Sequence, residues 1–463
     1  MVDIMENIPL LPPRTRHQTR ILILVCTVIV AIEIGDYLST APQTQILEEI
    51  ICRNLHPDAS SASICKDTDV QSELALLNGW KDTFSQVPAI ILALPFGVMA
   101  DRVGRKKVAL LSILGLMMQE VAMRVICWYS NIIPLQAIWF TPLFQICGGG
   151  SQIASSMVFT IVTDIYPVEK RATKFFFIAA AILLAEILAT PLSALLMVQS
   201  PWVPYLLGLL CEFVGVVAAL VVPETLPKIS DEVFDDDIPT PRRGSESLFR
   251  ALLHRAGAEI LRLREFITTT NNILAISVAF FAADVGKQAL QLMLQYVSKR
   301  FEWSMAKASI LISLKGIINL VLLLIILPIL SHLLDRRLSP LKRDLLIAQF
   351  SAAILVLGFI IMAIAPHPVL FGTGVCVFAL GWGFYSALRS VASALVSEAQ
   401  AGLLNTTIAL VQGVGGVVAG PALAGMFNYG MSLGGGWIGL PYLLGAGLFL
   451  GAGLVTVTVK IHR

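Results

Sequence analysis

The chain alternates long apolar runs with short polar segments, and this pattern predicts twelve membrane-spanning helices. The runs are close to, or longer than, the ~20 residues that a helix needs to cross the hydrocarbon core of a bilayer. They form two groups of six, with a long polar segment between the groups. The predicted spans are 21–40, 77–100, 108–129, 134–162, 174–198, 202–222, 272–297, 306–330, 344–364, 369–395, 403–427 and 437–459. The pattern therefore predicts an all-α membrane protein.

The polar segment 224–270 carries an acidic run and several prolines, a composition that cannot bury a core. Its last part, 247–266, alternates Leu and Phe with Arg and His at helical spacing. This predicts an amphipathic helix that lies on the membrane surface or docks on the inner face of the bundle. The expected organisation is a tail (1–20), a six-helix bundle (21–223), a cytoplasmic linker (224–270) and a second six-helix bundle (271–463).

Composition supports a membrane protein and excludes several other classes. The chain is 56% hydrophobic and 14% charged, whereas soluble domains carry about 25% charged residues. A net charge of +2 gives no reason to expect a nucleic-acid partner. The sequence has no nucleophile–base–acid set, no metal-ligand spacing and no nucleotide loop, so we expect neither an enzyme nor a cofactor or metal site.

Positive charges predict the orientation, because loops rich in Lys and Arg stay in the cytoplasm. The basic clusters at 102–107, 170–174, 242–243 and 336–343 all fall on the side of the N-terminus. Both termini are therefore predicted to be cytoplasmic, and loop 41–76 to be outside. Of the seven cysteines, only Cys52 and Cys65 fall in this polar loop. They can form a disulfide or remain two free thiols.

Several acids lie inside predicted spans, where an ionisable side chain costs roughly 3 kcal/mol or more and implies a partner, a cavity or a function. Glu33 and Asp36 share one face of the first span, and two close carboxylates favour retention of one proton. Glu186 lies in the fifth span without a basic neighbour in sequence. These three acids are the candidates for proton coupling. The alternatives are solvation of Glu33 and Asp36 near the outer end, and a structural hydrogen bond for Glu186.

The segment between the second and third spans reads Gly97-x-x-x-Asp101-Arg102-x-Gly104-Arg105. An ordinary basic loop is the simplest alternative, but in a chain of twelve spans this segment resembles the loop signature of the major facilitator superfamily. The resemblance implies two six-helix halves around a central cavity and transport by alternating access. It also implies that Asp101 meets the N-terminus of the span that begins near 403, and that Arg105 pairs with Asp164. Such contacts would hold the halves closed on the cytoplasmic side.

The same resemblance implies that the first, fourth, seventh and tenth spans line the cavity. Polar and aromatic side chains on these spans, together with a lysine of the eighth span, are then candidates for substrate binding. Asp284 can instead neutralise the nearby Lys287, Lys315 can pair with an acid of the first half, and Arg389 can serve as a gate or an anchor. The candidates are Gln145, Gln152, Asp284, Gln288, Gln291, Lys315, Trp382, Tyr385 and Arg389.

The predicted function is secondary active transport of a small organic molecule, coupled to protons. The composition and acidic linker resemble fungal-type exporters of drugs or secondary metabolites, and a diffuse resemblance to the proton-coupled folate transporter branch keeps another possibility open. That alternative is uptake of an anionic nutrient, with Lys287, Lys315 and Arg389 as anion contacts. The third possibility is a receptor that binds a nutrient without transporting it. We expect a monomer in the lipid bilayer of the plasma membrane.

Overall fold

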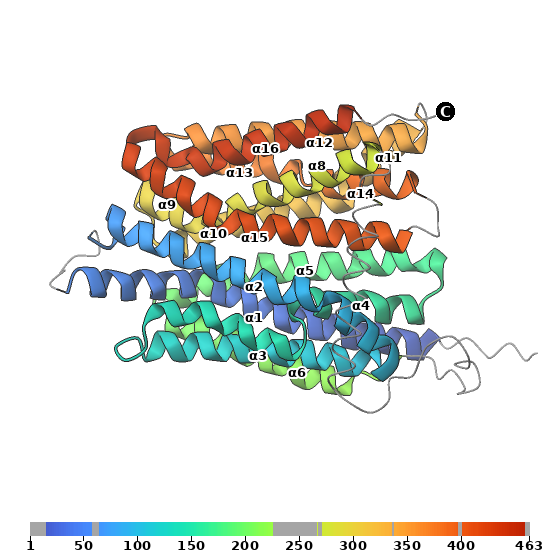
Figure 1. Cartoon of the computed structure of the whole chain (residues 1–463), viewed down its shortest axis with the longest axis horizontal. Helices are drawn as coiled ribbons and strands as arrows, with labels where there is room; N and C mark the ends of the chain where they lie inside the picture. Colours follow the sequence, from blue (N-terminus) through green and yellow to red (C-terminus); the bar gives the residue numbers. More distant parts are fainter. Residues whose placement is uncertain are drawn as a thin grey trace, which may run out of the picture.

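The computed structural model describes residues 15–57, 64–225, 266, 271–335, 338–396 and 401–458. The predicted linker and its amphipathic helix fall almost entirely outside these residues. Glu224, Thr225 and Phe266 are the exceptions, and the Phe266 side chain packs in the core of the second half. The helices form two layers that run along the long axis of the molecule, with the first half below the second in the view of Figure 1.

The first half contains six spans, which are formed by α-helices and one long 3-10 segment. Its elements are α1 (Thr15–Leu55), η1 (Ile64–Lys66), α2 (Thr68–Val103), α3 (Arg105–Trp128), η2 (Leu135–Cys147), α4 (Gly150–Ile165), α5 (Val168–Met197) and α6 (Trp202–Val221).

The second half repeats this count of spans with more interruptions along its helices. Its elements are α8 (Asn271–Gln288), η4 (Ala289–Leu292), α9 (Met293–Phe301), α10 (Met305–Val321), η5 (Leu322–Ile326), α11 (Leu327–Asp335), α12 (Pro340–Ile364), α13 (Pro368–Leu380), α14 (Gly383–Ala394), α15 (Ala401–Leu433), η7 (Gly435–Gly439) and α16 (Leu440–Val457).

Eleven helical segments of the described chain are long and apolar enough to cross a membrane. The 36-residue helix α2 overlaps the remaining predicted span and is the twelfth. The described residues contain no strand. The prediction of an all-α protein with twelve spans in two halves is therefore confirmed. Helix α1 begins, and α16 finishes, at the same end of the molecule (Figure 1); we call this the basic end and the opposite one the disulfide end.

The expectation of a long polar loop at 41–76 is wrong. Helix α1 continues to Leu55 and α2 begins at Thr68, so both spans extend well beyond the apolar runs. The extension is stable because it has its own apolar core. Ile46, Leu47 and Ile50 are buried in one cluster with Val70 and Leu74 of α2. The spacing of these residues places them on one face of each helix.

The fourth span is broken rather than continuous. It begins as the 3-10 segment η2, and α4 starts only at Gly150, after a turn in which Gly149 has φ 80°. A β-carbon at Gly148 would lie 2.3 Å from the carbonyl oxygen of Leu111 in α3. The glycine run therefore allows a left-handed turn and a close approach to α3, which agrees with a structural role.

The two halves meet along two helix pairs, α2 with α15 and α5 with α10. In the first pair small residues face each other: a β-carbon at Gly79 would lie 2.7 Å from the carbonyl oxygen of Gly420. The Thr83 hydroxyl donates to the carbonyl of Val417 in the same contact, at 3.0 Å. Small residues allow this close packing, which is the usual way in which helices associate inside a membrane.

The cores of the two halves are organised differently. The second half has one large core rich in aromatic rings, among them Phe359, Phe378 and Phe449. In the first half, separate apolar clusters lie toward the disulfide end and the basic end. Along α1, for example, the basic-end cluster ends at Ile29 and the disulfide-end cluster begins at Ile46. Ionisable residues occupy the intervening level, so the first half has a polar layer in the middle of its spans.

Candidate functional site

An ion pair joins the halves in the middle of the molecule. The Lys315 ammonium of α10 lies 2.8 Å from a carboxylate oxygen of Glu186 in α5, and the Glu186 side chain is 3% exposed. Glu186 has no basic neighbour in sequence but is paired here, and the alternative in which Lys315 pairs with an acid of the first half is observed. Sequence neighbours could not reveal this contact, because the cation comes from the other half. A charge so deeply buried needs such a partner.

The two acids of α1 extend the polar layer around this pair. Glu33 lies close enough to interact electrostatically with both Asp36 and Glu186, and Tyr37 is within reach of the same glutamate. Asp36 in turn interacts with Lys81 of α2. The structure thus brings the three predicted proton-coupling acids into one neighbourhood. They are linked to the second half through Lys315.

Lys81 and Asp82 are charged residues of this layer that sequence reasoning overlooked. They lie next to each other in α2, with the ammonium 3.6 Å from the carboxylate, and the Asp82 side chain is 40% exposed. Both fall inside the predicted span 77–100. Their charge inside an apolar run is the signal in the sequence that points to them.

Arg124 of α3 organises the rest of the polar layer. Its guanidinium lies 2.7 Å from Glu120 and 3.8 Å from Glu212 of α6. It also donates to Ser39 at 2.8 Å and to the carbonyl of Tyr205 at 3.1 Å. The Arg124 side chain is 5% exposed, and the Tyr205 ring lies 4.1 Å from its guanidinium carbon. This network satisfies the arginine from three helices, which indicates a structural role.

On the second half, α8 and α14 form an aromatic and charged surface. The Lys287 ammonium lies 5.7 Å from the ring centre of Trp382 and 6.0 Å from that of Tyr385. The Tyr385 hydroxyl donates to the carbonyl of Ala283 at 2.8 Å, which fixes the ring beside the buried Asp284. Four predicted residues therefore come together here, namely Asp284, Lys287, Trp382 and Tyr385. Rings and a cation so arranged can bind an aromatic or ionised organic group.

The remaining candidates for substrate binding are dispersed. Gln288 lies near α15, where a β-carbon at Gly416 would be 3.8 Å from its amide nitrogen, and Gln291 is exposed. Gln145 is 3% exposed and donates to Gln119 inside the first half. Its predicted contact with substrate is not supported, because the break in the fourth span turns this side chain toward α3.

Helices α4 and α14, which form the basic-end parts of the fourth and tenth spans, each carry a row of exposed polar side chains. Polar side chains of membrane helices avoid lipid, so these rows point to a solvent-accessible interior. Gln152 and Arg389, two of the predicted substrate contacts, belong to them. The rows comprise Ser151, Gln152, Ser155 and Ser156 of α4, and Ser386, Arg389, Ser390 and Ser393 of α14.

The loop between α2 and α3 is held at the basic end by contacts inside the first half. Arg105 lies 3.5 Å from Asp164, the partner expected from the sequence. The Glu224 carboxylate accepts the backbone N–H of Arg105 at 2.8 Å and that of Lys106 at 3.3 Å. An acid at this position satisfies free N–H groups at the start of α3 and complements the helix dipole. The sequence did not reveal this cap, because Glu224 is remote from α3 along the chain.

The loop signature also contains two charged residues, Asp101 and Arg102, and two glycines, Gly97 and Gly104. The side chains of Asp101 and Arg102 lie outside the described residues, so the expected contact of Asp101 with α15 stays a prediction. Gly97 has open space around its β-carbon position. Gly104 has φ 117°, and a β-carbon there would lie 2.2 Å from a Glu224 oxygen. The glycine at 104 is therefore required both by the backbone conformation and by the carboxylate.

Replacing Gly104 with alanine should destabilise the protein and impair transport. The substitution strains the backbone by about 1–3 kcal/mol and displaces Glu224 from the start of α3. A lower midpoint of thermal unfolding in detergent is the expected result. Gly97→Ala is the matched control, since a β-carbon there meets nothing within 4 Å. An unfolding midpoint of Gly104→Ala equal to that of the control would mean that the carboxylate cap is dispensable.

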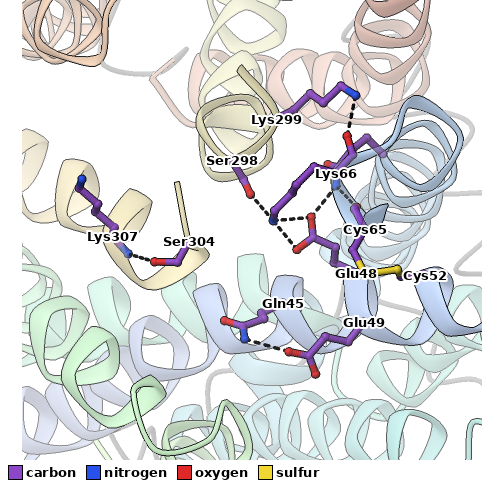
Figure 2. A network of polar contacts seen from close by, with 11 residues as sticks. Gln45, Glu48, Glu49, Cys52, Cys65, Lys66, Ser298, Lys299, Ser304 and Lys307 are labelled. Atoms are coloured by element: carbon purple, nitrogen blue, oxygen red, sulfur yellow. Dashed lines mark hydrogen bonds and ion pairs between the residues drawn. A yellow bond between two sulfur atoms is a disulfide. The ribbon is translucent and has the colours of Figure 1, made fainter. Parts of the chain in front are cut away.

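A second network joins the halves at the disulfide end (Figure 2). Cys52 of α1 and Cys65 of η1 form a disulfide. The Lys66 ammonium lies 2.6 Å from Glu48 of α1 and donates to the Ser298 hydroxyl of α9. Lys299 donates to the backbone carbonyl of Lys66. Apart from the two cysteines, none of these residues was singled out from the sequence, because their partners are remote along the chain.

Comparison with known proteins identifies the family. The sequence profile described as Major Facilitator Superfamily matches residues 69–420. The chain is 32% identical to the MFS efflux pump atnC of Emericella nidulans over 96% of its own length and 88% of that protein. It is 33% identical to the efflux pump ustT of Aspergillus flavus, over 87% of this chain and 81% of the relative.

Solved structures agree with the fold. The crystal structure of the human organic anion transporter MFSD10 matches with a TM-score of 0.62 and 15% identity, over 95% of this chain and 99% of that one. The D-xylose-proton symporter matches with a TM-score of 0.65 and 13% identity, over 95% and 97%. Together with the twelve spans and the polar interior, these matches define an integral membrane transporter rather than an enzyme. The chain belongs to the major facilitator superfamily.

Proposed function

We propose that this transporter exports a small organic molecule, of the drug or secondary-metabolite kind, in exchange for protons. Two observations support the direction and the coupling. Two fungal relatives that match 96% and 87% of the chain are named efflux pumps. The buried Glu186–Lys315 pair, which carries the proposal, places a titratable acid at the contact between the halves.

The proposed coupling uses this ion pair as the link between proton binding and movement of the halves. A proton on Glu186 removes its charge and weakens its attraction to Lys315, which frees α10 from α5. Glu33 and Asp36 extend the polar layer and can pass the proton onward. Coupling requires that the proton and the substrate each bind the two states with different free energies. A contact that exists in one state and is controlled by a proton meets this requirement.

The substrate is proposed to bind between the halves, at the surface formed by α8 and α14. Trp382 and Tyr385 offer rings for stacking, while Asp284, Lys287 and Gln291 provide polar contacts. The exposed polar rows on α4 and α14 would form the path from the basic end. Both termini and the linker at 224–270 are proposed to be cytoplasmic, on the basis of the basic loops, and the protein to act as a monomer in the plasma membrane.

Uptake of an anionic nutrient is less well supported. That proposal needed Lys287 and Lys315 to be available for an anion. Lys315 is paired with Glu186, and Lys287 lies over the rings of Trp382 and Tyr385. The uptake proposal thus loses Lys315 and keeps Lys287 and Arg389, the latter on the exposed row of α14, as anion contacts.

Transport by the purified protein in liposomes tests the proposal directly. A panel of hydrophobic drugs, secondary metabolites and organic anions would be followed with and without an imposed pH gradient. We expect an apolar or cationic compound to move in the direction opposite to the flow of protons. Accumulation of anions on the side that receives protons would instead establish uptake. Transport that does not depend on the pH gradient would mean that the protein is a facilitator. Glu186 would then have no role in proton coupling.

A further inference from the structure

The disulfide end is closed by a network that centres on one lysine. Lys66 belongs to the three-residue segment η1, which buries none of its side chains. Its ammonium contacts Glu48 of the first half and Ser298 of the second, as Figure 2 shows. Lys299 of the second half reaches back to the carbonyl of Lys66 and, at 3.4 Å, to the Thr68 hydroxyl. Lys66 therefore contacts both halves through its side chain and its backbone.

The side chains that contact Lys66, and the glutamines beside them, lie inside the protein. Glu48 is 4% exposed, Gln71 and Ser298 are 0% exposed, and Gln295 is 2% exposed. Gln71 donates to Glu48 and to the carbonyl of Cys65, while Gln295 of the second half donates to the carbonyl of Gln71. Buried and connected polar contacts are worth more than exposed ion pairs, which contribute about 0–1 kcal/mol.

The disulfide anchors the residue next to Lys66. A helical segment of three residues does not hold a position by itself, because it gains too few hydrogen bonds and contacts. Cys65 precedes Lys66 directly and is bonded to Cys52, which is 2% exposed in the core of the disulfide end. The covalent bond thus anchors η1 to α1 at the residue next to the lysine.

We propose that Lys66 is a positioning residue that latches the two halves together at the disulfide end, and that the Cys52–Cys65 bond holds it in place. We call the contacts of Lys66 with Glu48, Ser298 and Lys299 the latch. The inference rests on the alternating access proposed above, because a latch matters only if this end also opens. Opening requires Lys66 to leave Ser298 and Lys299 to leave the Lys66 carbonyl, while the Glu48 contact within the first half can persist.

Hydrogen–deuterium exchange of the full chain in lipid nanodiscs tests the latch without substrate or proton gradient. Lys66→Met should raise exchange by about fivefold or more at 64–71 and 293–301, a shift typical of coupled equilibria. Exchange in α4 and α14, which form the basic-end parts of their spans, should fall at the same time, because opening one end closes the other. The reciprocal fall separates a change of state from local loosening.

Two further variants separate the latch from damage to the fold. Ser298→Ala removes only the acceptor in the second half and leaves no buried charge, so it should shift exchange in the same direction by less. Cys65→Ser should reproduce Lys66→Met, and the double variant should be no worse than Lys66→Met alone, because both act through one contact. Additive effects would mean that the disulfide acts independently of Lys66.

Matched controls are available within the same region. Lys307 of α10 lies 4.2 Å from the Trp303 ring of its own half, and Glu49 accepts from Gln45 on the surface of α1 at 2.8 Å. Lys307→Met and Glu49→Gln should leave exchange at 293–301 unchanged. The latch is refuted if Lys66→Met matches these controls, or if its effect stays within 52–71 with α4 and α14 unchanged. Neither outcome depends on which compound is transported, so failure of the latch is distinguishable from failure of the proposed export.

Discussion

Glu186→Gln should lower the proton-driven accumulation of substrate in liposomes by at least about tenfold, which corresponds to roughly 1.4 kcal/mol of coupling free energy. Glutamine keeps the shape of the side chain but cannot carry the charge that attracts Lys315. The variant should still bind substrate and exchange it across the membrane, because the rings of α14 are untouched. The measurement is accumulation at a fixed pH gradient, compared with exchange at equal pH.

The controls for this variant distinguish coupling from stability. Asp335 is also an acid in an ion pair, but its partner is Arg343 and the pair lies on the surface at the basic end. Asp335→Asn should therefore keep full coupling. The double variant Glu186→Gln/Lys315→Met removes both charges and so avoids a lone buried cation. It should be better folded than Lys315→Met and remain uncoupled. Persistent coupling in this double variant would show that the pair only holds the halves together.

Arg124→Met should cause the largest loss of stability. The substitution leaves Glu120 and Glu212 in the polar layer without their cation, and removing one partner of a buried ion pair typically costs about 3–5 kcal/mol. We expect a strongly lowered midpoint of thermal unfolding and a poor yield of monodisperse protein. Addition of Glu212→Gln should recover part of the loss, since it removes one of the unpaired acids.

Arg53→Met is the matched control for Arg124. Arg53 donates to Ser130 at 2.9 Å in an exposed contact at the disulfide end, so its loss should shift the unfolding midpoint little. If Arg124→Met were as stable as this control, the acids of the polar layer would have to be neutral or otherwise paired. Arg124 would then be a candidate for substrate or proton binding instead of a structural centre.

The two halves differ in their ionisable and aromatic residues, and this difference suggests separate roles in transport. The first half carries its ionisable groups in a layer between two apolar clusters, which suits proton handling. The second half has a continuous aromatic core, and it contributes Lys315 and the rings of α14. The proposed export therefore takes its proton from one half and most substrate contacts from the other. The ion pair of Glu186 with Lys315 joins the two halves.

The sequence alone determined the architecture of this protein. Apolar runs long enough to cross a bilayer predicted every span, because lipid forces each crossing segment to satisfy its own backbone as a helix. The loop signature from Gly97 to Arg105 placed the chain in its family, and the pairing of Arg105 with Asp164 followed from it. The i,i+4 spacing of Glu120 and Arg124 is a local pattern of the same kind, because it favours their ion pair.

Tertiary structure decided which charges meet. Lys315 pairs with Glu186, Lys66 with Glu48 and Ser298, and Glu224 with the start of α3, across separations that no local pattern records. The packing likewise turned Gln145 away from the interior. The physical reason is that hydrophobicity is a property of each segment, whereas the partner of a buried charge depends on how twelve helices pack around one another.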